Sequence, residues 1–364
     1  MAVLGRRDEP TDAVEEYSQY LSKALAAREI VLELTSIAWA EKGWRRALDE
    51  FRKSALLTGN AKWFLLQYTA LAWSRHGFSI RALQVIRLVK SAGARCAVVF
   101  HDIEGYYGNR LVDRLRRAVQ EWTMRQAVKL ADLAIFTIPP KIIRWLPAAT
   151  QNAVCIPVGA NLPRPEMAWK QTGLSREHTP TVAVFSLSDH GVRATEVRDI
   201  AEATRYATER IGKLRVVLLG RNSEKGGKEL KERLLGAPVE IVAYGLLAAE
   251  QVVQVLGGCD VMLFARGFVS TRRGSAIAGI ACGLPLVGRG GWETAAPITE
   301  AGVTFIPERE KVGFGPALLR VLTDESYRSS MAERSKNAQR QYFSWDIIAE
   351  QYERALRNEN AAKM

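Results

Sequence analysis

The sequence has 364 residues, a length that suggests two domains rather than one. Hydrophobic residues make up 48% of it, enough to fill two ordinary cores, and no uncharged apolar run reaches the ~18 residues of a transmembrane helix. The first ten residues, MAVLGRRDEP, lack the apolar core of a signal peptide. We therefore expect a cytoplasmic protein.

The net charge is +12, and it is unevenly distributed. Residues 1–165 carry 24 Lys and Arg against 15 Asp and Glu. Such a field attracts phosphates, nucleic acid or the negative inner face of a membrane, and its sign alone does not choose among them. No nucleic-acid-binding module is recognisable, so we expect no nucleic-acid partner.

Four cysteines, Cys96, Cys155, Cys259 and Cys282, stand far apart, without a CxxC motif or a Cys/His cluster. This spacing predicts buried thiols rather than disulfides or metal ligands.

The first half of the chain alternates helical and strand-like segments. Apolar residues at helical spacing predict helices at 13–28, 79–92 and 110–130. Apolar and β-branched runs predict strands at 29–39, 63–69, 95–100, 133–138 and 153–157. Strands separated by helices of this length indicate a parallel sheet with helices on both faces.

Residues 163–180 are polar and proline-rich, which indicates an interdomain linker, and the alternation then restarts. Strands are predicted at 181–187, 215–220, 239–245, 260–265, 284–288 and 303–306, and helices at 194–211, 225–235, 248–257 and 274–283. Residues 329–357 are strongly helical, with a break at 342–346. The second half is the clearer Rossmann-like domain.

Two segments carry a family resemblance. Cys259–Gly291 reads CDVMLFARGFVSTRRGSAIAGIACGLPLVGRGG, and Phe343–Tyr352 reads FSWDIIAEQY. In this order they resemble the donor-site segment and the C-terminal end of GT-B glycosyltransferases of the large retaining group, family 4. Near the N-terminus, GRRDEPTDAVEEY is similar to that group's first glycine-containing loop and helix.

The resemblance implies an α/β fold with two Rossmann-like domains facing a central cleft. The expected parts are an acceptor-side domain at 1–165, a nucleotide-sugar domain at 166–340 and a C-terminal helix at 341–364 that packs back on the first domain. The implied activity is transfer of a hexose-type sugar from a nucleotide-diphosphate sugar to a glycan or lipid-linked acceptor, in polysaccharide or glycolipid synthesis. Retention of configuration, and transfer without a metal or another cofactor, are implied in the same way.

The predicted donor site begins after the strand at 260–265. Gly274 and Ser275 stand where a helix starts, so its free N–H groups and its dipole point at a ligand, and Arg272 and Arg273 precede it. The alternative is a helix of small residues that only packs on the sheet.

Other residues expected at the donor follow further strands. Positive charge stabilises a departing diphosphate, and the candidates are Arg193 after the first strand of the second domain and Arg221 with Lys225 after the second strand. Each has the alternative of an ordinary surface cation. Gly245 and Leu246 precede the donor loop, and Gly5 in the first loop permits close approach to the transferring sugar.

The chain departs from the family pattern at one important place. The retaining group carries two glutamates eight positions apart across this loop and helix, and the second binds the donor ribose. Anchored on ACGLP, these positions fall on Ser270 and Ala278. Either the ribose is held by Ser270, Thr271 or a backbone carbonyl, or catalysis has been lost; Glu293 is near in sequence but matches poorly.

The missing glutamates keep a second function open, that of a non-catalytic GT-B-like protein that binds a nucleotide sugar or a partner. A nucleotide-sugar epimerase is a third possibility, for which we would expect paired acids in the cleft, and none is convincingly placed.

Three polar residues follow the strongest predicted strand of the first half: His101, Asp102 and Glu104. The family often has a histidine at this strand end, where it hydrogen-bonds the sugar or stabilises developing charge. Asp102 or Glu104 can accept hydroxyl hydrogen bonds or act as a base. The alternative is that all three cap the next helix. The Asp-x-Glu spacing imitates a metal site, but GT-B enzymes generally use basic residues instead, so we expect no metal.

The predicted helix at 110–130 is rich in arginine interleaved with Leu111, Leu115 and Trp122. Trp145, close to Lys141 and Arg144, adds an expected interfacial aromatic. Such a surface lies on an anionic membrane and presents a lipid-linked acceptor, which predicts a peripheral association with its inner face. The alternative is an ordinary solvated helix face.

Overall fold

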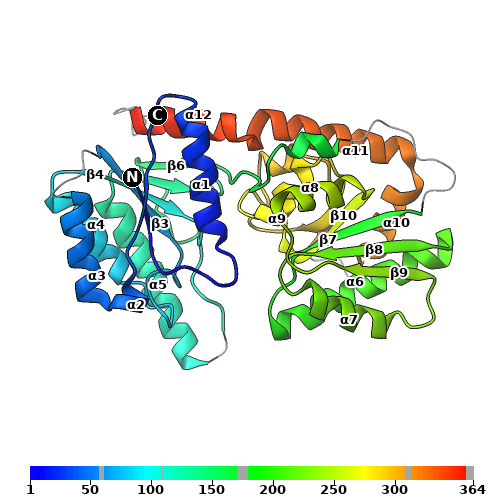
Figure 1. Cartoon of the computed structure of the whole chain (residues 1–364). Helices are drawn as coiled ribbons and strands as arrows, with labels where there is room; N and C mark the ends of the chain where they lie inside the picture. The colour runs from blue at the N-terminus through cyan, green and yellow to red at the C-terminus, as the bar shows by residue number, and fades with distance from the viewer. Residues whose placement is uncertain (57–60, 109, 170–178, 309–312, 358–364) are drawn as a thin grey trace. The chain divides into compact units, whose positions relative to one another are not determined.

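The computed structural model describes residues 1–56, 61–108, 110–169, 179–308 and 313–357. The chain forms two compact units: unit 1 is Met1–Pro157 with Trp345–Met364, and unit 2 is Val158–Ser344. It leaves unit 1 at Pro157 and returns at Trp345 (Figure 1). Of the predicted linker at 163–180, residues 170–178 lie outside the described residues, and Pro165–Ala168 form the 3-10 helix η3, which packs on α8 (Ala249–Gly257) in unit 2.

Unit 1 contains one six-stranded parallel sheet in the order β2-β1-β3-β4-β5-β6. Its strands are β1 (Ala2–Leu4), β2 (Leu34–Ser36), β3 (Trp63–Tyr68), β4 (Arg95–Phe100), β5 (Leu133–Phe136) and β6 (Ala153–Cys155). Its helices are α1 (Ala13–Ala26), α2 (Trp39–Lys42), α3 (Trp44–Phe51), the π-helix η1 (Arg52–Leu56), α4 (Arg81–Ser91), α5 (Leu111–Leu130), the 3-10 helix η2 (Pro140–Ile142) and α12 (Trp345–Arg357).

The last helix, α12, packs on the first, α1, as expected from the sequence (Figure 1). The hydroxyl groups of Tyr17 and Tyr352 are buried against each other at 2.9 Å. Arg28 forms an ion pair with Glu353, and the ring of Trp345 lies 5.2 Å from that of Tyr17. The packing of unit 1 is therefore completed by a helix from the far end of the chain.

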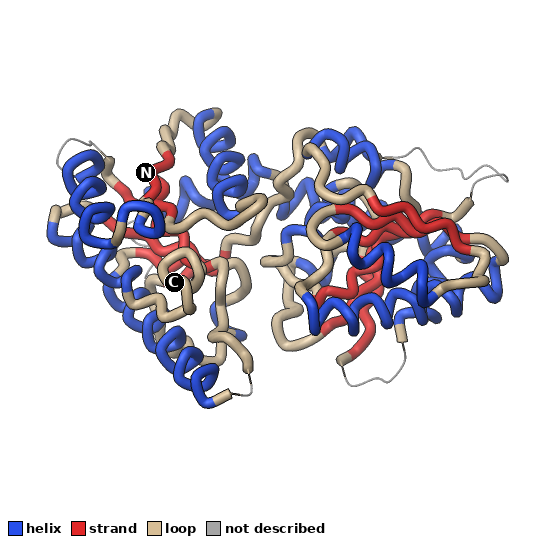
Figure 2. The backbone as a smooth tube through the Cα atoms, turned by 60° about the horizontal axis from the view of Figure 1, so that its bottom comes forward, coloured by secondary structure: helices blue, strands red, loops and turns tan. Residues whose placement is uncertain are grey.

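Unit 2 contains a second six-stranded parallel sheet, in the order β12-β11-β10-β7-β8-β9. Its strands are β7 (Thr181–Phe185), β8 (Leu214–Leu219), β9 (Val239–Ala243), β10 (Val261–Phe268), β11 (Leu286–Gly290) and β12 (Val303–Pro307). Its other helices are α6 (His190–Ile211), α7 (Ser223–Arg233), α9 (Gly274–Ala281), the 3-10 helix η4 (Ile298–Glu300), α10 (Phe314–Thr323), α11 (Glu325–Ala338) and the π-helix η5 (Gln339–Phe343). Figure 2 shows the strands of each unit gathered into one sheet with helices packed along it.

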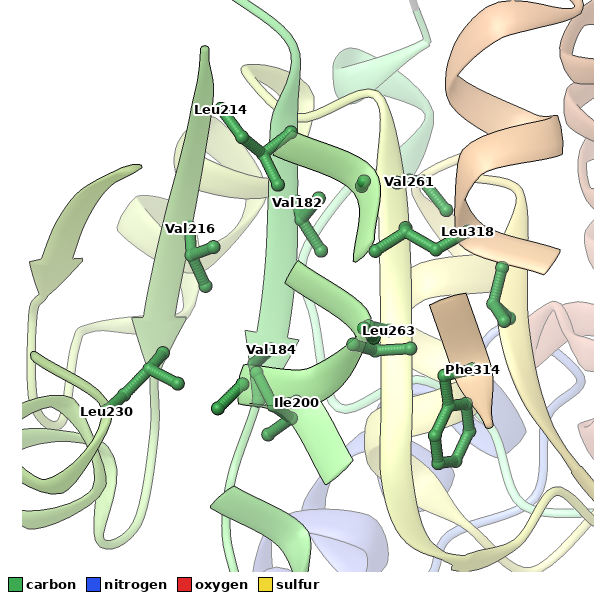
Figure 3. Packing of buried hydrophobic residues seen from close by; sticks show 14 of the residues in the cluster. Val182, Val184, Ile200, Leu214, Val216, Leu230, Val261, Leu263, Phe314 and Leu318 are labelled. Atoms are coloured by element: carbon green, nitrogen blue, oxygen red, sulfur yellow. The ribbon is translucent and has the colours of Figure 1, made fainter. Parts of the chain in front are cut away.

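The core of unit 2 lies between its sheet and the helices α6 and α10. Val184 of β7 and Leu263 of β10 meet Ile200 of α6 and Phe314 of α10, all of them at most 2% exposed (Figure 3). The central strands are apolar over most of their length because helices cover both faces of a parallel sheet.

The predicted strand at 29–39 is wrong over most of its length. Only Leu34–Ser36 form a strand, at the edge of the sheet, and Trp39 begins α2. The indole N–H of Trp39 donates to the carbonyl of Ala72 at 2.8 Å, which holds the residue in the loop and helix after β2. Tertiary contacts thus override a local β-propensity. Helices α2, α3 and α10 were not predicted from the sequence.

A candidate anion-binding site in unit 2

The topological switch point of the second sheet lies between β7 and β10. From β7 the chain moves outward through β8 and β9, and from β10 it moves the opposite way through β11 and β12. Open parallel sheets bind ligands at the carboxyl ends of the two strands that flank such a point. Helices α6 and α9 start after these two strands, so two positive helix ends lie at this edge.

The loop between β7 and α6 is fixed from two sides. The carboxylate of Glu196, which is 3% exposed, accepts hydrogen bonds from the backbone N–H of Ser188 at 2.8 Å and from its hydroxyl at 2.6 Å. The amide of Asn222 donates to Asp189 at 3.0 Å. Ser186 holds a left-handed φ of 64°, a conformation that costs about 1 kcal/mol or more outside glycine and recurs at ligand sites.

Glu293 organises the loop between β10 and α9. Its carboxylate is 1% exposed and accepts from Nε of Arg272, from Nη2 of Arg273 at 2.7 Å and from the hydroxyl of Ser270 at 3.2 Å. A carboxylate therefore stands beside Ser270, at the position where the family pattern has its first glutamate. From the sequence, Glu293 was considered because it is near but was set aside because it matches the family pattern poorly; the fold brings its carboxylate to Ser270, 23 positions earlier in the chain.

Arg266 lies near the end of β10 and was missed from the sequence. A register shift between Phe264 and Phe268, together with the positive φ of 72° at Gly267, breaks the regular strand at this point. Burial lowers the pKa of the Arg266 guanidinium, and so does repulsion from Arg221 and Arg272. Within the described part of the chain, Arg266 makes no hydrogen bond and no ion pair.

Four arginines thus share one neighbourhood: Arg221, Arg266, Arg272 and Arg273. Burial and repulsion from Arg272 and Arg266 lower the pKa of Arg273 too, and its Nε is buried without a hydrogen-bond partner. Glu293 neutralises part of this charge, and Glu196 and Asp189 favour the charged form of Arg266 from a distance. Partly buried cations that repel one another are stabilised by an anionic ligand.

The other basic candidates have different surroundings. Nε and Nη2 of Arg193 both lie near Oε1 of Glu229, at 3.0 and 2.9 Å, so this ion pair joins α6 to α7. Lys225 is exposed in the first turn of α7. Arg221 is the only one of the three sequence-predicted cations Arg193, Arg221 and Lys225 whose charge acts on Arg266 in the described structure.

The small residues of the predicted donor site lie at the same strand ends. Gly274 is exposed, and a β-carbon added to it would have nothing within 4 Å, while Ser275 is partly buried beside it. Thr271 is buried, and its carbonyl accepts from the N–H of Val158 at 3.0 Å. Ala278 is buried inside α9 and contributes no polar group.

Gly245 and Leu246 follow β9. The carbonyl of Gly245, whose φ is 71°, accepts from the N–H of Gly220 at 2.7 Å, and Leu246 is 49% exposed. They lie after β9, which is the edge strand beyond β8.

The candidate residues of unit 1 follow β1 and β4. His101 is engaged with side chains rather than with a helix end: its Nε2 lies 2.8 Å from Oε1 of Gln67, and its ring meets Tyr17 edge-on at 5.1 Å. Burial lowers its pKa to about 4, so the imidazole is neutral at pH 7. Because an amide oxygen only accepts, Nε2 carries the proton in this arrangement and Nδ1 is left as an acceptor.

Of the two acids beside His101, one contacts the loop after β3 and the other contacts its own loop. Asp102 accepts from the N–H of Ala70 at 2.7 Å, and Glu104 accepts from the hydroxyl of Tyr107 at 3.1 Å. At the N-terminus of helix α5, Asp113 accepts from the N–H of Arg110.

Gly5 lies after β1 in a tight contact. A β-carbon on it would come within 2.3 Å of the carbonyl oxygen of Ala72. Only glycine fits at this point of the loop.

Trp145 was expected at an interface, and that prediction is wrong. It is 7% exposed, packs beside Phe100 and Phe136, and donates its indole N–H to the carbonyl of Ile103 at 2.7 Å. The indole ring is therefore part of the core of unit 1, packed on aromatic side chains of β4 and β5.

Across the described ranges, no three His, Cys, Asp or Glu side chains are grouped so as to hold a metal ion. No helix among the described residues has the length and apolar character needed to span a membrane.

Comparison with known proteins identifies the fold. No family model matches the sequence, and no curated protein matches it. Among solved structures, sucrose-phosphate synthase from Thermosynechococcus elongatus is similar with a TM-score of 0.69 and 16% identity, over 100% of this chain and 99% of that one. Anabaena HepE in complex with UDP and glucose has a TM-score of 0.64 and 13% identity, with 98% of both chains covered.

A third similar structure is WaaG, a glycosyltransferase involved in lipopolysaccharide biosynthesis, with a TM-score of 0.64, 15% identity and 98% and 99% coverage of the two chains. The likeness extends over both units and confirms the fold class predicted from the sequence. The chain has the fold of the GT-B glycosyltransferases, built from two Rossmann-like α/β units.

Proposed function

We propose that this chain is a glycosyltransferase that binds a nucleotide-diphosphate sugar through unit 2. The observation that carries the proposal is the convergence of Arg221, Arg266, Arg272 and Arg273 with two helix N-termini at the switch point of the sheet. A diphosphate supplies the charge that this cluster lacks, and the same cluster stabilises it as a leaving group. Solved structures of the similar Anabaena protein hold UDP and UDP-glucose, which makes UDP the first nucleotide to test.

The finer parts of the proposal follow from the family resemblance. The sugar is hexose-type, the acceptor is a glycan or a lipid-linked molecule, and transfer proceeds with retention. Arginines and helix ends supply the positive charge in place of a metal, so activity in the presence of EDTA is expected. In unit 1, the neutral His101 offers hydrogen bonding to a sugar, with Asp102 and Glu104 in the same loop.

Nucleotide binding is the first test. Melting temperature is measured with UDP, GDP, ADP and CDP and with their common sugars. A ligand at about 100 times its Kd adds roughly 2.7 kcal/mol to the folded state, which raises the melting temperature by several degrees. Arg266→Gln should remove most of this shift, because it deletes a central cation.

Arg215→Gln is the matched control. Arg215 is an arginine near the start of β8, at the opposite edge of the same sheet, and is paired with Glu240. No shift with any nucleotide in the folded protein, or equal shifts in both variants, would contradict the assigned site. A shift without sugar transfer or donor hydrolysis would favour the non-catalytic alternative that the changes at Ser270 and Ala278 raise.

A specific observation also supports membrane association. Six large apolar side chains between residues 106 and 122 are 45–81% exposed, and we call them the α5 patch: Tyr106, Tyr107, Leu111, Val112, Leu115 and Trp122. Arg110 and Arg114 are exposed among them. We propose that the α5 patch lies in the headgroup region of an anionic membrane, with its arginines at the lipid phosphates.

Sedimentation with vesicles tests this proposal. Binding is expected to vesicles of phosphatidylcholine with phosphatidylserine and not to phosphatidylcholine alone, and Leu111→Ser with Leu115→Ser should abolish it. Leu235→Ser, at a side chain 89% exposed in unit 2, is the control. Binding that survives the double substitution, or that Leu235→Ser also abolishes, would refute the proposal.

A further inference from the structure

Unit 1 contains a pocket that has no part in the proposed donor site. Its volume is about 480 Å³, within the range of small-molecule sites. The lining comes from the segments that follow β2 and β3 and from the start of α4: Trp39, Ala40, Gly43, Trp44, Ser74, Arg75, His76, Phe78 and Arg81. Helices α2, α3 and α4, seen together in Figure 1, bring these segments to one place.

Arg81 is the central side chain of this pocket. Its guanidinium lies 4.8 Å from the ring of Trp39 and 5.2 Å from the ring of Trp44, so it is held between two indoles. Both indoles are themselves anchored, Trp39 to the carbonyl of Ala72 and Trp44 to the side chain of Gln84. In the described residues Arg81 has no hydrogen-bond acceptor and no acidic partner. Its five N–H donors are thus positioned without being used.

The rest of the pocket lining contains one further positive charge, that of Arg75. Arg75 and His76 contribute to the lining, and none of the lining residues is acidic. Helix α4 begins at Arg81 with no side-chain cap and no acidic residue in its first turn, so its positive end adds to the field. Aromatic rings favour a cation but do not neutralise it or satisfy its N–H groups.

The pocket lies at the carboxyl edge of the unit 1 sheet, because its segments follow strands β2 and β3. The carbonyl of Ala72 accepts from Trp39 of the pocket and also from the N–H of Arg6, next to Gly5. Ala72 therefore lies between the pocket and the loop after β1 and contacts both.

We propose that this pocket binds the phosphate or carboxylate group of a small-molecule ligand, with the planar Arg81 guanidinium as its principal donor. Such an oxyanion receives two parallel N–H groups from Arg81, further positive charge from Arg75 and a ring N–H of His76. The identity of the ligand rests on the proposed function: it is the acceptor, a sugar or glycan end that carries an oxyanion. The site itself does not depend on the donor site, which lies in the other unit.

The test measures binding by calorimetry with inorganic phosphate, glucose 6-phosphate, glucuronate and uncharged glucose. Saturable binding is expected for glucose 6-phosphate or glucuronate and not for glucose, and the preferred one of the two identifies the oxyanion. Arg81→Gln should weaken it by about tenfold to a hundredfold, the loss expected for charge-assisted hydrogen bonds. Arg81→Lys keeps the charge but not the planar fork of N–H groups. Its affinity should lie between that of the parent and that of Arg81→Gln.

Arg95→Gln is the matched control, because Arg95 also lies over an indole, that of Trp63 at 5.5 Å, at the opposite end of the sheet. Arg75→Ala is a second variant should Arg81→Gln lower the melting temperature. Absence of saturable binding by every anion, or binding unaffected by Arg81→Gln, overturns the inference.

UDP binding measured on the same samples separates the two proposals. Oxyanion binding that depends on Arg81, in a protein that binds no nucleotide, supports the pocket while the proposed function fails. Nucleotide binding without oxyanion binding overturns the pocket alone.

Discussion

Replacement of Glu293 by glutamine tests whether the β10–α9 loop is held by one buried carboxylate. Glu293 is 1% exposed and accepts from Arg272, Arg273 and Ser270. Removing one partner from a buried ion pair costs about 3–5 kcal/mol, because the remaining charge is left unpaired. The side chains of Arg272 and Arg273 are 19% and 26% exposed, so water recovers part of the loss. We expect a loss of about 3 kcal/mol.

In a domain of this size, 1 kcal/mol corresponds to roughly 2–4 °C, so the melting transition of unit 2 should fall by about 10 °C. The assay is differential scanning calorimetry with and without 10 mM phosphate, roughly the concentration needed to populate a weak anion site. Phosphate should recover more stability in the variant than in the parent, since the uncompensated arginines then attract an anion more strongly.

Glu240→Gln is the control for the ordinary loss of an ion pair. Glu240 pairs with Arg215, both about half exposed, and its loss should cost less than about 1 kcal/mol. A Glu293→Gln variant that melts within about 1 °C of the parent would refute the reasoning. So would a control that loses as much stability as the variant.

Three further predictions concern unit 1. The pKa of His101 is lowered from 6.5 to about 4, so the unfolded chain binds more protons than the folded one between these pH values. The free energy of unfolding should therefore fall by about 3 kcal/mol as the pH drops from 6.5 to 4. Urea titrations at several pH values should show that this dependence is lost in His101→Gln. Gly5→Ala should cost about 1–3 kcal/mol in thermal melts, because its new methyl group meets the backbone oxygen of Ala72. Tyr352→Phe should cost about 1–3 kcal/mol by leaving the hydroxyl of Tyr17 buried without a partner, and the double variant Tyr17→Phe/Tyr352→Phe should cost less than the sum of the two single changes.

Each of these has a control and a contradicting result. His76→Gln, at an exposed histidine, should keep the acid slope, and a slope that persists in His101→Gln would contradict the assignment. Gly313→Ala, with nothing within 4 Å, should be nearly neutral, and equal losses at Gly5 and Gly313 would contradict the steric argument. Strict additivity of the two tyrosine changes would show that their hydroxyls are not coupled.

The buried strands were predictable because their pattern is local. Strand β4 has the predicted bounds, Arg95–Phe100, and β7 starts at the predicted Thr181. Parallel strands covered on both faces are short continuous apolar runs, and their length, below that of most helices, favours the strand. Where the environment is half exposed the local pattern failed, as in residues 29–33 before the short edge strand β2.

The candidate site was only partly predictable, because its charges come from distant parts of the chain. Arg272 and Arg273 were found from their place before a helix. Arg266 was missed because it stands inside the extended end of β10, beyond the predicted strand end at 265. Glu293 was undervalued because it matches the family pattern poorly, and only the fold shows that its carboxylate meets Arg272, Arg273 and Ser270. A charged residue at the carboxyl end of a buried strand was the available signal for Arg266.

The return of the chain to unit 1 has a consequence for biosynthesis. During translation, Met1–Pro157 emerge from the ribosome long before α12, which covers Tyr17 and completes their packing. Unit 2 is one continuous segment and acquires all its strands and helices first. The N-terminal part must therefore persist with an uncovered apolar face on α1 until α12 has been synthesised, and exposed apolar surface of this kind is what chaperones and proteases recognise.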